Sequence, residues 1–342
     1  MHRHTHMSAV VLLSIVILTA CVRSAESVAP SPSPAALPPP GRGINLGNAL
    51  EASWEGEWDM VLQEEYFELI RNAGFDTVRI PIRWSSHADS QPPYTIEPAF
   101  FDRVDWAVEQ ALSRGLIAVI NMHHYEALMA RPDAHRERFL AMWRQIAEHY
   151  RHHPPTLYFE ILNEPNGYLT PSLWNEYLRE ALAVIRESNP ERTVVIGTAE
   201  WGGLRGLNSL SVPEDEHLIM TFHYYEPFQF THQGTEWVNG SSRWLGTKWR
   251  GTKREKEAVR RHMDAAAAWG REHGLPVWMG EFGAYSKADQ RSRVRWTSFV
   301  VREAEARGIA WAYWEFGAGF GVYDREAGRW RDDLLNALIP TE

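Results

Sequence analysis

The chain has 342 residues, of which 44% are hydrophobic and 23% are charged, and its formal net charge is −9. These proportions are typical of a soluble globular protein, and the acidic balance argues against nucleic acid, whose phosphates need a Lys- and Arg-rich surface. A neutral polymer fits the charge. The 16 Trp and 12 Tyr residues favour carbohydrate only slightly, because large rings also fill protein cores.

The N-terminus has the pattern of an export signal. Residues 1–20 join a basic residue, Arg3, to an apolar run that is too short to span a bilayer as a mature helix. The run ends in Leu18-Thr19-Ala20-Cys21, which resembles the lipobox of bacterial lipoproteins. We therefore predict a lipoprotein signal peptide over residues 1–20 and lipidation of Cys21, with the protein anchored at the cell surface or outer membrane. The alternative is an ordinary secretory signal that contains a cysteine by chance.

A Pro-, Ser- and Ala-rich segment follows at residues 21–40. Such a composition cannot bury a core and stays extended, so we predict a linker. Cys21 is the single cysteine of the chain, which excludes an intramolecular disulfide. A folded part of this size needs none, and we expect it to occupy residues 41–342 as one domain.

Within residues 41–342, eight short apolar runs alternate with amphipathic helical patterns. Their Val, Ile, Leu, Met and aromatic content is typical of parallel strands that are buried on both faces. The expected strands are residues 43–47, 77–81, 117–123, 157–162, 193–197, 218–224, 277–280 and 309–314.

The helical patterns between these strands occupy residues 64–73, 100–114, 134–150, 171–188, 253–273 and 290–307. Gly115, Gly274 and Gly308 follow three of them, at the position where glycine commonly ends a helix. The alternation predicts an α/β protein with a single (β/α)8 TIM barrel. The alternative, a doubly wound sheet, would usually show a Gly-rich phosphate loop after its first strand, and residues 41–48 do not have that spacing.

The active site of such a barrel forms at the C-terminal ends of its strands. In this sequence those ends turn polar or aromatic after apolar strands. The candidate site residues are Asn48, Glu51, Arg79, His123, His124, Asn163, Glu164, Trp201, His223, Tyr225, Glu281 and Trp314.

Two of these candidates are glutamates, Glu164 in Asn-Glu-Pro and Glu281 in Gly-Glu-Phe-Gly. They follow the fourth and seventh strands, which lie across the barrel mouth from each other. Glycoside hydrolysis commonly uses two carboxyl groups that flank the scissile bond. A single glutamate would more often cap a helix or form a surface ion pair, but two at strand ends indicate a glycosidase.

The pair His123-His124 raises the alternative of a metal site. Adjacent strand residues point to opposite faces, so the two rings should not chelate one ion. We therefore predict no metal and no cofactor. We expect both histidines to bind sugar hydroxyls and orient the catalytic carboxylates, with a core or loop role as the alternative.

The segment 226–251 is a long loop after the sixth strand, and long loops in compact domains are often functional. It contains His232, Trp237, Trp244 and Trp249. We expect Trp237 to stack on a sugar and Trp244 and Trp249 to pack within the loop.

Six motifs together resemble glycoside hydrolase family 5, the cellulase family, from residue 43 to about residue 339. Two further segments, residues 197–203 and 230–237, resemble a bacterial branch of endoglucanases that often act on both glucan and mannan. The six motifs occur in the order of the family and are residues 77–81, 121–125, 159–165, 223–225, 280–283 and 312–314.

The resemblance implies that Glu164 is the acid/base and Glu281 the nucleophile, which Arg79 and Tyr225 would hold ionised. It places His223 near Glu164. It further implies Asn163 at the 2-hydroxyl of the sugar, Trp314 beneath the sugar of the −1 subsite, and cleft positions for Asn48, Glu51, His123, His124, His232 and Trp237.

We expect a monomeric, retaining endo-β-1,4-glycanase that cleaves glucan and also mannan. An exo-acting β-glucosidase or another β-glycanase is the enzymatic alternative. A sugar-binding lipoprotein without catalysis is the other, but the presence of both Glu164 and Glu281 argues against it.

Overall fold

The computed structural model describes residues 1–2 and 40–340. Eight parallel strands close into one barrel in sequence order, with β1 paired to both β2 and β8. This confirms the predicted single (β/α)8 barrel. The strands are β1 (Arg42–Asn45), β2 (Thr77–Ile80), β3 (Ile117–Asn121), β4 (Leu157–Glu160), β5 (Val194–Gly197), β6 (Leu218–Tyr224), β7 (Val277–Phe282) and β8 (Ala310–Tyr313).

The predicted signal peptide and linker and the lipidation site Cys21 fall within residues 3–39, apart from the outermost residues of the two segments. They therefore lie outside the described residues. Within the described part of the chain, no helix has the length and apolar character that crossing a bilayer requires.

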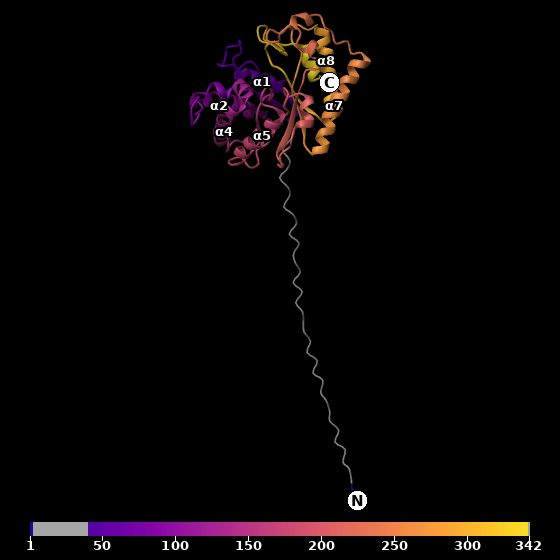
Figure 1. Cartoon of the computed structure of the whole chain (residues 1–342). Coiled ribbons are helices and arrows are strands. Elements are labelled where there is room, and N and C mark those ends of the chain that lie inside the picture. The colour runs from indigo at the N-terminus through magenta and orange to yellow at the C-terminus, as the bar shows by residue number, and fades with distance from the viewer. Residues whose placement is uncertain (3–39, 341–342) are drawn as a thin grey trace. The chain divides into compact units, whose positions relative to one another are not determined.

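Helices surround the barrel, with α1, α2, α4 and α5 on one side and α7 and α8 on the other (Figure 1). These six are the expected helices, and their bounds agree with the expected ones to within two residues. The helices are α1 (Glu64–Asn72), α2 (Pro98–Ser113), α3 (Glu126–Ala130), α4 (Pro132–His149), α5 (Pro171–Arg186), α6 (Phe228–Thr231), α7 (Lys253–His273), α8 (Gln290–Glu305) and α9 (Asp332–Leu338).

Local sequence sets the ends of α7. Thr252 caps its N-terminus, and the side chain of Glu255 returns a bond to the backbone of Thr252, which completes a capping box. Gly274 ends the helix with φ at +66°, a conformation that glycine adopts without strain. The same turn recurs at Gly115 and Gly308, which also have positive φ, and it directs the chain into the next strand.

Two connections differ from the expected pattern. A 3-10 helix, η2 (Leu204–Ser209), links β5 to β6 in place of an α-helix. The chain turns tightly there, because a Cβ on Gly206 would lie 2.4 Å from the carbonyl oxygen of Ala199. After β8, a hairpin of β9 (Tyr323–Asp324) and β10 (Arg329–Trp330) precedes α9. Strands of two residues are too short to give a periodic signal.

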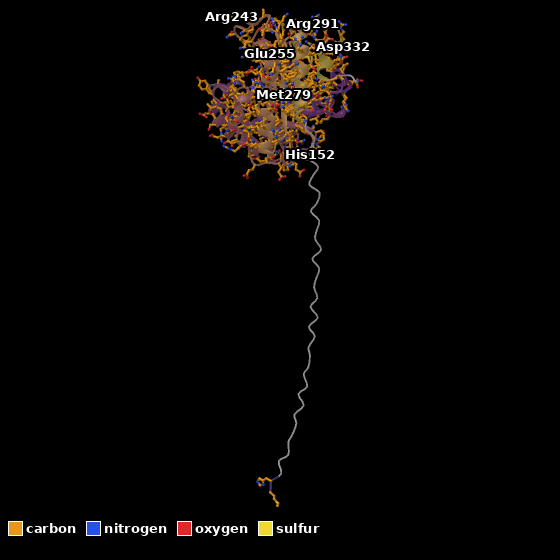
Figure 2. The ribbon with its side chains drawn as sticks, turned by 90° about the vertical axis from the view of Figure 1, so that its right-hand side faces the viewer. His152, Arg243, Glu255, Met279, Arg291 and Asp332 are labelled. Carbon is orange, nitrogen blue, oxygen red and sulfur yellow. The ribbon has the colours of Figure 1, made fainter. Side chains whose placement is uncertain are left out.

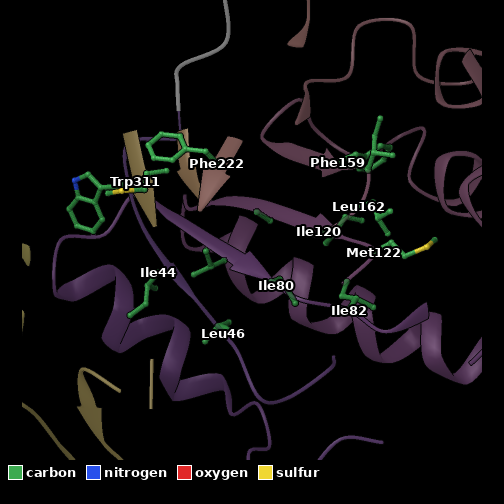
Figure 3. Close-up of a cluster of buried hydrophobic side chains, with 14 of the residues drawn as sticks. Ile44, Leu46, Ile80, Ile82, Ile120, Met122, Phe159, Leu162, Phe222 and Trp311 are labelled. Atoms are coloured by element: carbon green, nitrogen blue, oxygen red, sulfur yellow. The ribbon is translucent and has the colours of Figure 1, made fainter. Parts of the chain in front are cut away.

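The strands bury opposite faces in two separate clusters. Their outward side chains, among them Ile44, Ile80 and Ile120 (Figure 3), pack against the helices in the large core. Their inward side chains form a second, smaller apolar cluster that fills the barrel: Ile117, Val119, Tyr158, Val195, Ile219, Trp278 and Ala312. Apolar side chains therefore fill the lower part of the barrel interior. We call this cluster the floor, because it lies beneath the C-terminal ends of the strands.

Candidate active site

Above this floor the inward-facing residues change from apolar to polar. The strand period of two explains the change. Along β3, Val119 is followed two positions later by Asn121, and along β4, Tyr158 is followed by Glu160. The polar layer therefore lies toward the C-terminal ends of the strands. Figure 2 places Arg243 and Arg291 at that end of the molecule, His152 at the other, and Met279 of β7 between them.

Arg79 of β2 is the centre of the polar layer. It is fully buried, and all five of its N–H groups donate hydrogen bonds. Two form a fork to Glu160, at 2.6 and 2.8 Å. The others reach Oδ1 of Asn45 at 2.9 Å, Oε1 of Glu281 at 2.6 Å and Oδ1 of Asn163 at 2.7 Å. One guanidinium thus fixes groups from β1, β4 and β7.

Glu281 of β7 is buried beneath the barrel mouth. Its Oε1 accepts from Arg79, and its Oε2 accepts from the Tyr225 hydroxyl at 2.9 Å. Burial raises the pKa of Glu281 above its usual value of 4.5, and the Glu164 carboxylate adds to the rise. His223, Arg79 and Tyr225 act in the opposite direction, since they favour the charged carboxylate. Arg79 and Tyr225 thus lower the pKa of Glu281, as expected, but burial raises it by more.

Glu164 follows β4 with a backbone φ of +45°, a region that residues other than glycine seldom adopt. Such conformations cluster at functional sites. Its side chain is 24% exposed, so it can meet a ligand from the cleft. Nδ1 of His223 lies 2.7 Å from Oε1 of Glu164 and 3.5 Å from Oε2 of Glu281. Burial lowers the pKa of His223, but the charges of Glu281 and Glu164 outweigh burial and raise it overall.

The two glutamates face each other across this histidine. One carboxylate oxygen of Glu164, one of Glu281 and a ring nitrogen of His223 all lie within 4.8 Å of one another. A cation would find three ligand atoms there. However, the Arg79 guanidinium already contacts Glu281, and its positive charge disfavours a second cation at the same carboxylate. The arrangement suits a pair of acid and base groups.

Three aromatic rings at the C-terminal ends of β3 and β8 contact one another. His123 stacks on Trp314 with ring centroids 5.6 Å apart and an interplanar angle of 9°. His124 touches His123 edge to face at 4.7 Å. The expectation that the two histidines point to opposite faces was wrong, because β3 ends at Asn121 and the strand alternation stops before them. Burial lowers the pKa of His123 well below its usual value of 6.5, which favours the neutral ring.

The loop after β6 presents one tryptophan and buries another. Trp237 is 63% exposed and rests edge to face against Tyr285 at 5.3 Å. Trp249 is buried and packs against Phe299, and Trp244 is half-buried against Phe228. His232 is buried beside Tyr225 at 4.9 Å, and burial lowers its pKa to about 4.

Three other predicted site residues, Asn48, Glu51 and Trp201, lie on the loops after β1 and β5. Trp201 is 65% exposed, on the loop after β5. Asn48 lies just after β1 with φ at +68°. Glu51 is buried and accepts hydrogen bonds from the backbone N–H groups of Asn48 and Ala49, so it shapes this loop. Its predicted contact with a sugar stays a prediction, as do the sugar contacts of Asn48, Trp201, His232 and Trp237.

Sequence reasoning missed two residues of the polar layer, Glu160 and Asn45. Both are buried inside strands. Glu160 had a signal, because a carboxylate within an apolar strand must have a partner. Asn45 donates to the carbonyl oxygens of Gly280 and Tyr313 at 3.0 and 3.2 Å, and no local pattern identifies such long-range partners. A further buried carboxylate belongs to Glu315, which follows β8. Its buried carboxylate accepts backbone N–H groups of the loop after β8, from Gly317, Ala318 and Phe320.

Comparison with known proteins gives consistent matches. A family model described as "Cellulase (glycosyl hydrolase family 5)" matches residues 40–319. The chain is 39% identical over 326 residues to Endoglucanase H of Acetivibrio thermocellus, covering 92% of this chain and 35% of that protein. It is 31% identical to the cellulase/esterase CelE of the same organism, covering 80% of this chain and 35% of CelE. The chain thus spans about a third of the length of these curated relatives.

Solved structures resemble the barrel over nearly their whole length. Cel5A of Thermotoga maritima in complex with mannotriose superposes with a TM-score of 0.87 at 55% identity, covering 88% of this chain and 97% of that chain. The structure of the same protein with cellobiose gives a TM-score of 0.87 at 56% identity, with the same coverage.

Proposed function

Because the chain belongs to glycosyl hydrolase family 5, the cellulase family, we propose that it is a retaining endo-β-1,4-glycanase that hydrolyses glucan and mannan chains. The observation that supports this most directly is the approach of Glu164 and Glu281 to within 4.8 Å. Both glutamates and Arg79 belong to one barrel, so a single chain is the proposed working unit.

The proposed reaction has two steps. In the first, a carboxylate oxygen of Glu281 attacks the anomeric carbon while the carboxylic acid of Glu164 donates its proton to the glycosidic oxygen. The bond to the leaving chain breaks, and a glycosyl ester on Glu281 remains. In the second step the Glu164 carboxylate takes a proton from water, and the water oxygen attacks the anomeric carbon. The ester bond breaks, which frees the sugar and restores both glutamates.

Surrounding groups prepare this chemistry before a sugar arrives. Arg79 and the Tyr225 hydroxyl each hold one oxygen of Glu281, which fixes the direction of attack. The amide oxygen of Asn163 is taken by Arg79, so its NH2 group is directed elsewhere. We assign that NH2 group to the 2-hydroxyl of the reacting sugar, a contact that strengthens in the transition state.

The separation of the two carboxyl groups supports retention of configuration. Retaining enzymes hold the two carboxyl groups about 5–5.5 Å apart, whereas inverting enzymes leave about 6.5–9.5 Å for a water molecule. A closest approach within 4.8 Å fits the shorter class. The test is proton NMR of the first product, which should be the β-anomer before mutarotation. Early appearance of the α-anomer would show that Glu281 acts as a base on water.

Activity on both glucan and mannan is the finer part of the proposal. Glucose and mannose differ at C2, and the similar Cel5A structures are described as complexes with mannotriose and with cellobiose. Reducing-sugar release from carboxymethyl-cellulose, barley β-glucan, glucomannan and xylan, measured side by side, tests the range. Comparable kcat/KM on β-glucan and glucomannan is expected. Absence of mannan cleavage would restrict the enzyme to glucans.

We further propose that the enzyme is exported and held at the outer face of the cell by acyl groups on Cys21. The single cysteine of the chain lies where a lipobox requires it, and several acyl chains suffice for stable anchoring. Labelled palmitate should enter the wild-type protein and be absent from Cys21→Ser, with catalysis unchanged. Unlabelled wild-type protein found wholly in the medium would indicate an ordinary secretory signal.

A further inference from the structure

The turn that follows β5 has an unusual backbone and lies beside the proposed acid/base. Glu200, Trp201 and Gly202 have φ angles of +59°, +64° and +65°, so three consecutive residues lie in the left-handed region. Of the three, only Gly202 adopts this conformation without strain. Glu164 is also left-handed, with φ at +45°. Strain of this kind persists only where the surrounding structure holds it, and it clusters at functional sites.

Hydrogen bonds fix the turn on both sides of Glu164. The backbone N–H of Trp201 donates to the carbonyl oxygen of Pro165, the residue after Glu164, at 3.2 Å. The backbone N–H of His223 on β6 donates to the carbonyl oxygen of Gly202 at 2.8 Å. The turn is therefore tied to the two elements that carry Glu164 and His223.

The backbone of Gly202 packs closely against the pair that these two side chains form. A Cβ added to Gly202 would lie 3.3 Å from Cγ of Glu164 and 3.4 Å from both Cγ and Nδ1 of His223. Nδ1 is the atom that lies 2.7 Å from Oε1 of Glu164. These distances are shorter than the usual carbon contact of about 3.5–4.0 Å. A methyl group would therefore displace the pair by a few tenths of an ångström.

Glu164 needs such a packing surface, because its side chain is 24% exposed and its proton must reach one atom, the glycosidic oxygen. Proton transfer requires the two heavy atoms to approach to about 2.6–3.2 Å. The bond to His223 holds one oxygen of the carboxyl group, and the backbone of Gly202 limits movement of the stem at Cγ. A displaced carboxyl group would still fit the cleft but would deliver its proton poorly.

We propose that Gly202 is a positioning residue for proton transfer: the turn of residues 200–202 holds the Glu164–His223 pair in the geometry from which Glu164 protonates the leaving group. This inference rests on the proposed function. Gly202 acts through Glu164 and touches no reacting atom. Its contribution should therefore grow with the leaving group's need for a proton.

The test uses two aryl β-cellobiosides whose leaving groups differ in acidity, together with β-glucan. A 2,4-dinitrophenyl group departs with little protonation, whereas a phenyl group and a glucan chain need the proton. Gly202→Ala should lower kcat/KM about tenfold on phenyl β-cellobioside and on β-glucan, and leave kcat/KM on the dinitrophenyl substrate near wild type. The ratio of the two cellobioside values, measured on one preparation, does not depend on how much of the protein is folded.

Two other glycines separate this effect from the strain of a left-handed alanine. Gly203→Ala adds a methyl group one residue further on, where φ is −79° and the nearest atom beyond the chain neighbours is 3.5 Å away. Gly115→Ala adds one where φ is +71° and, among the described residues beyond its chain neighbours, no atom lies within 4 Å. Both variants should keep the wild-type ratio, although Gly115→Ala should lower Tm.

A second variant covers poor folding of Gly202→Ala. Adding Glu200→Gly removes left-handed strain at an exposed position and keeps the methyl group against Glu164. The double variant should show the same selective loss.

Two outcomes would overturn the proposal. An equal loss on all three substrates would assign the turn to the fold or to substrate binding, and wild-type rates on all three would remove Gly202 from proton transfer. Failure of the wild type to cleave β-glucan and both cellobiosides would instead refute the proposed glycanase activity.

Discussion

The interior of the barrel is apolar toward the N-terminal ends of the strands and ionic toward their C-terminal ends, although the same strands build both halves. Tyr158 and Glu160 are two residues apart on β4, yet Tyr158 belongs to the apolar floor and Glu160 to the Arg79 network. The floor keeps water and charge out from below. The polar layer above it therefore lies in a low-dielectric surrounding, where each ionic contact is stronger than in water. The lower half serves stability, and the upper half holds the residues of the proposed reaction.

The largest expected effect comes from removing the charged groups at the top of the polar layer. Glu281→Ala eliminates the nucleophile, and activity should fall at least 10³-fold, or about 4 kcal/mol. Azide should restore turnover by occupying the space of the carboxylate, giving the α-glycosyl azide.

Glu164→Ala should impair polysaccharide cleavage most and the first step on an activated aryl glycoside least, because a good leaving group needs little protonation. Near-wild-type polysaccharide hydrolysis by either variant would contradict the assignment.

Substitutions in the apolar floor should instead lower the stability of the protein and leave its kcat nearly unchanged. Trp278 is fully buried in the inner cluster. Trp278→Ala would leave a cavity, and the free energy of unfolding should fall by about 3–5 kcal/mol. Urea denaturation measures the loss. The kcat of the folded variant, assayed at low temperature, should stay close to wild type. Trp278→Phe is the milder companion, and a large loss of kcat in that variant would show that the floor shapes the site directly.

Glu160 tests the boundary between the two halves. Its carboxylate shares Arg79 with Glu281, so Glu160→Gln should leave more of the guanidinium charge to act on Glu281 and lower the pKa of the nucleophile. The acid limb of the kcat/KM profile should move to lower pH, and the maximum rate should fall about tenfold, or about 1.4 kcal/mol. A lower rate with no shift of the acid limb would show that Glu160 supports the structure of the site and does not act on the pKa of Glu281.

The smallest effect concerns Glu51, whose pKa burial raises from 4.5 to about 8, with Glu315 adding to the rise against the backbone N–H bonds of Asn48 and Ala49. The folded state then holds this proton more tightly than the unfolded chain. Its stabilising contribution is complete below about pH 4.5 and is lost as pH rises through about 8. Glu51→Gln removes the buried charge, so its Tm relative to wild type should be higher at pH 9 than at pH 5. Calorimetry at both pH values measures this, with the exposed Glu65→Gln as control for the loss of one charge. A pH-independent difference would contradict the shift.

The barrel and the family could be predicted from the sequence alone, because both depend on signals that are local along the chain. Apolar runs of strand length, helical periodicity and glycines such as Gly274 encode the eight βα repeats. Glu164 and Glu281 are recognisable because each follows its strand directly within a short motif.

Which side chains meet inside the barrel and over its mouth depends instead on long-range packing. Glu160 and Arg79 are 81 positions apart, and they pair only because strand register and barrel closure bring their inward faces to the same level. Trp58 likewise meets His124 edge to face, although the two rings come from loops after different strands, and no pattern near residue 58 encodes that contact. Periodicity fixes the face on which a side chain lies, whereas long-range packing fixes its partner.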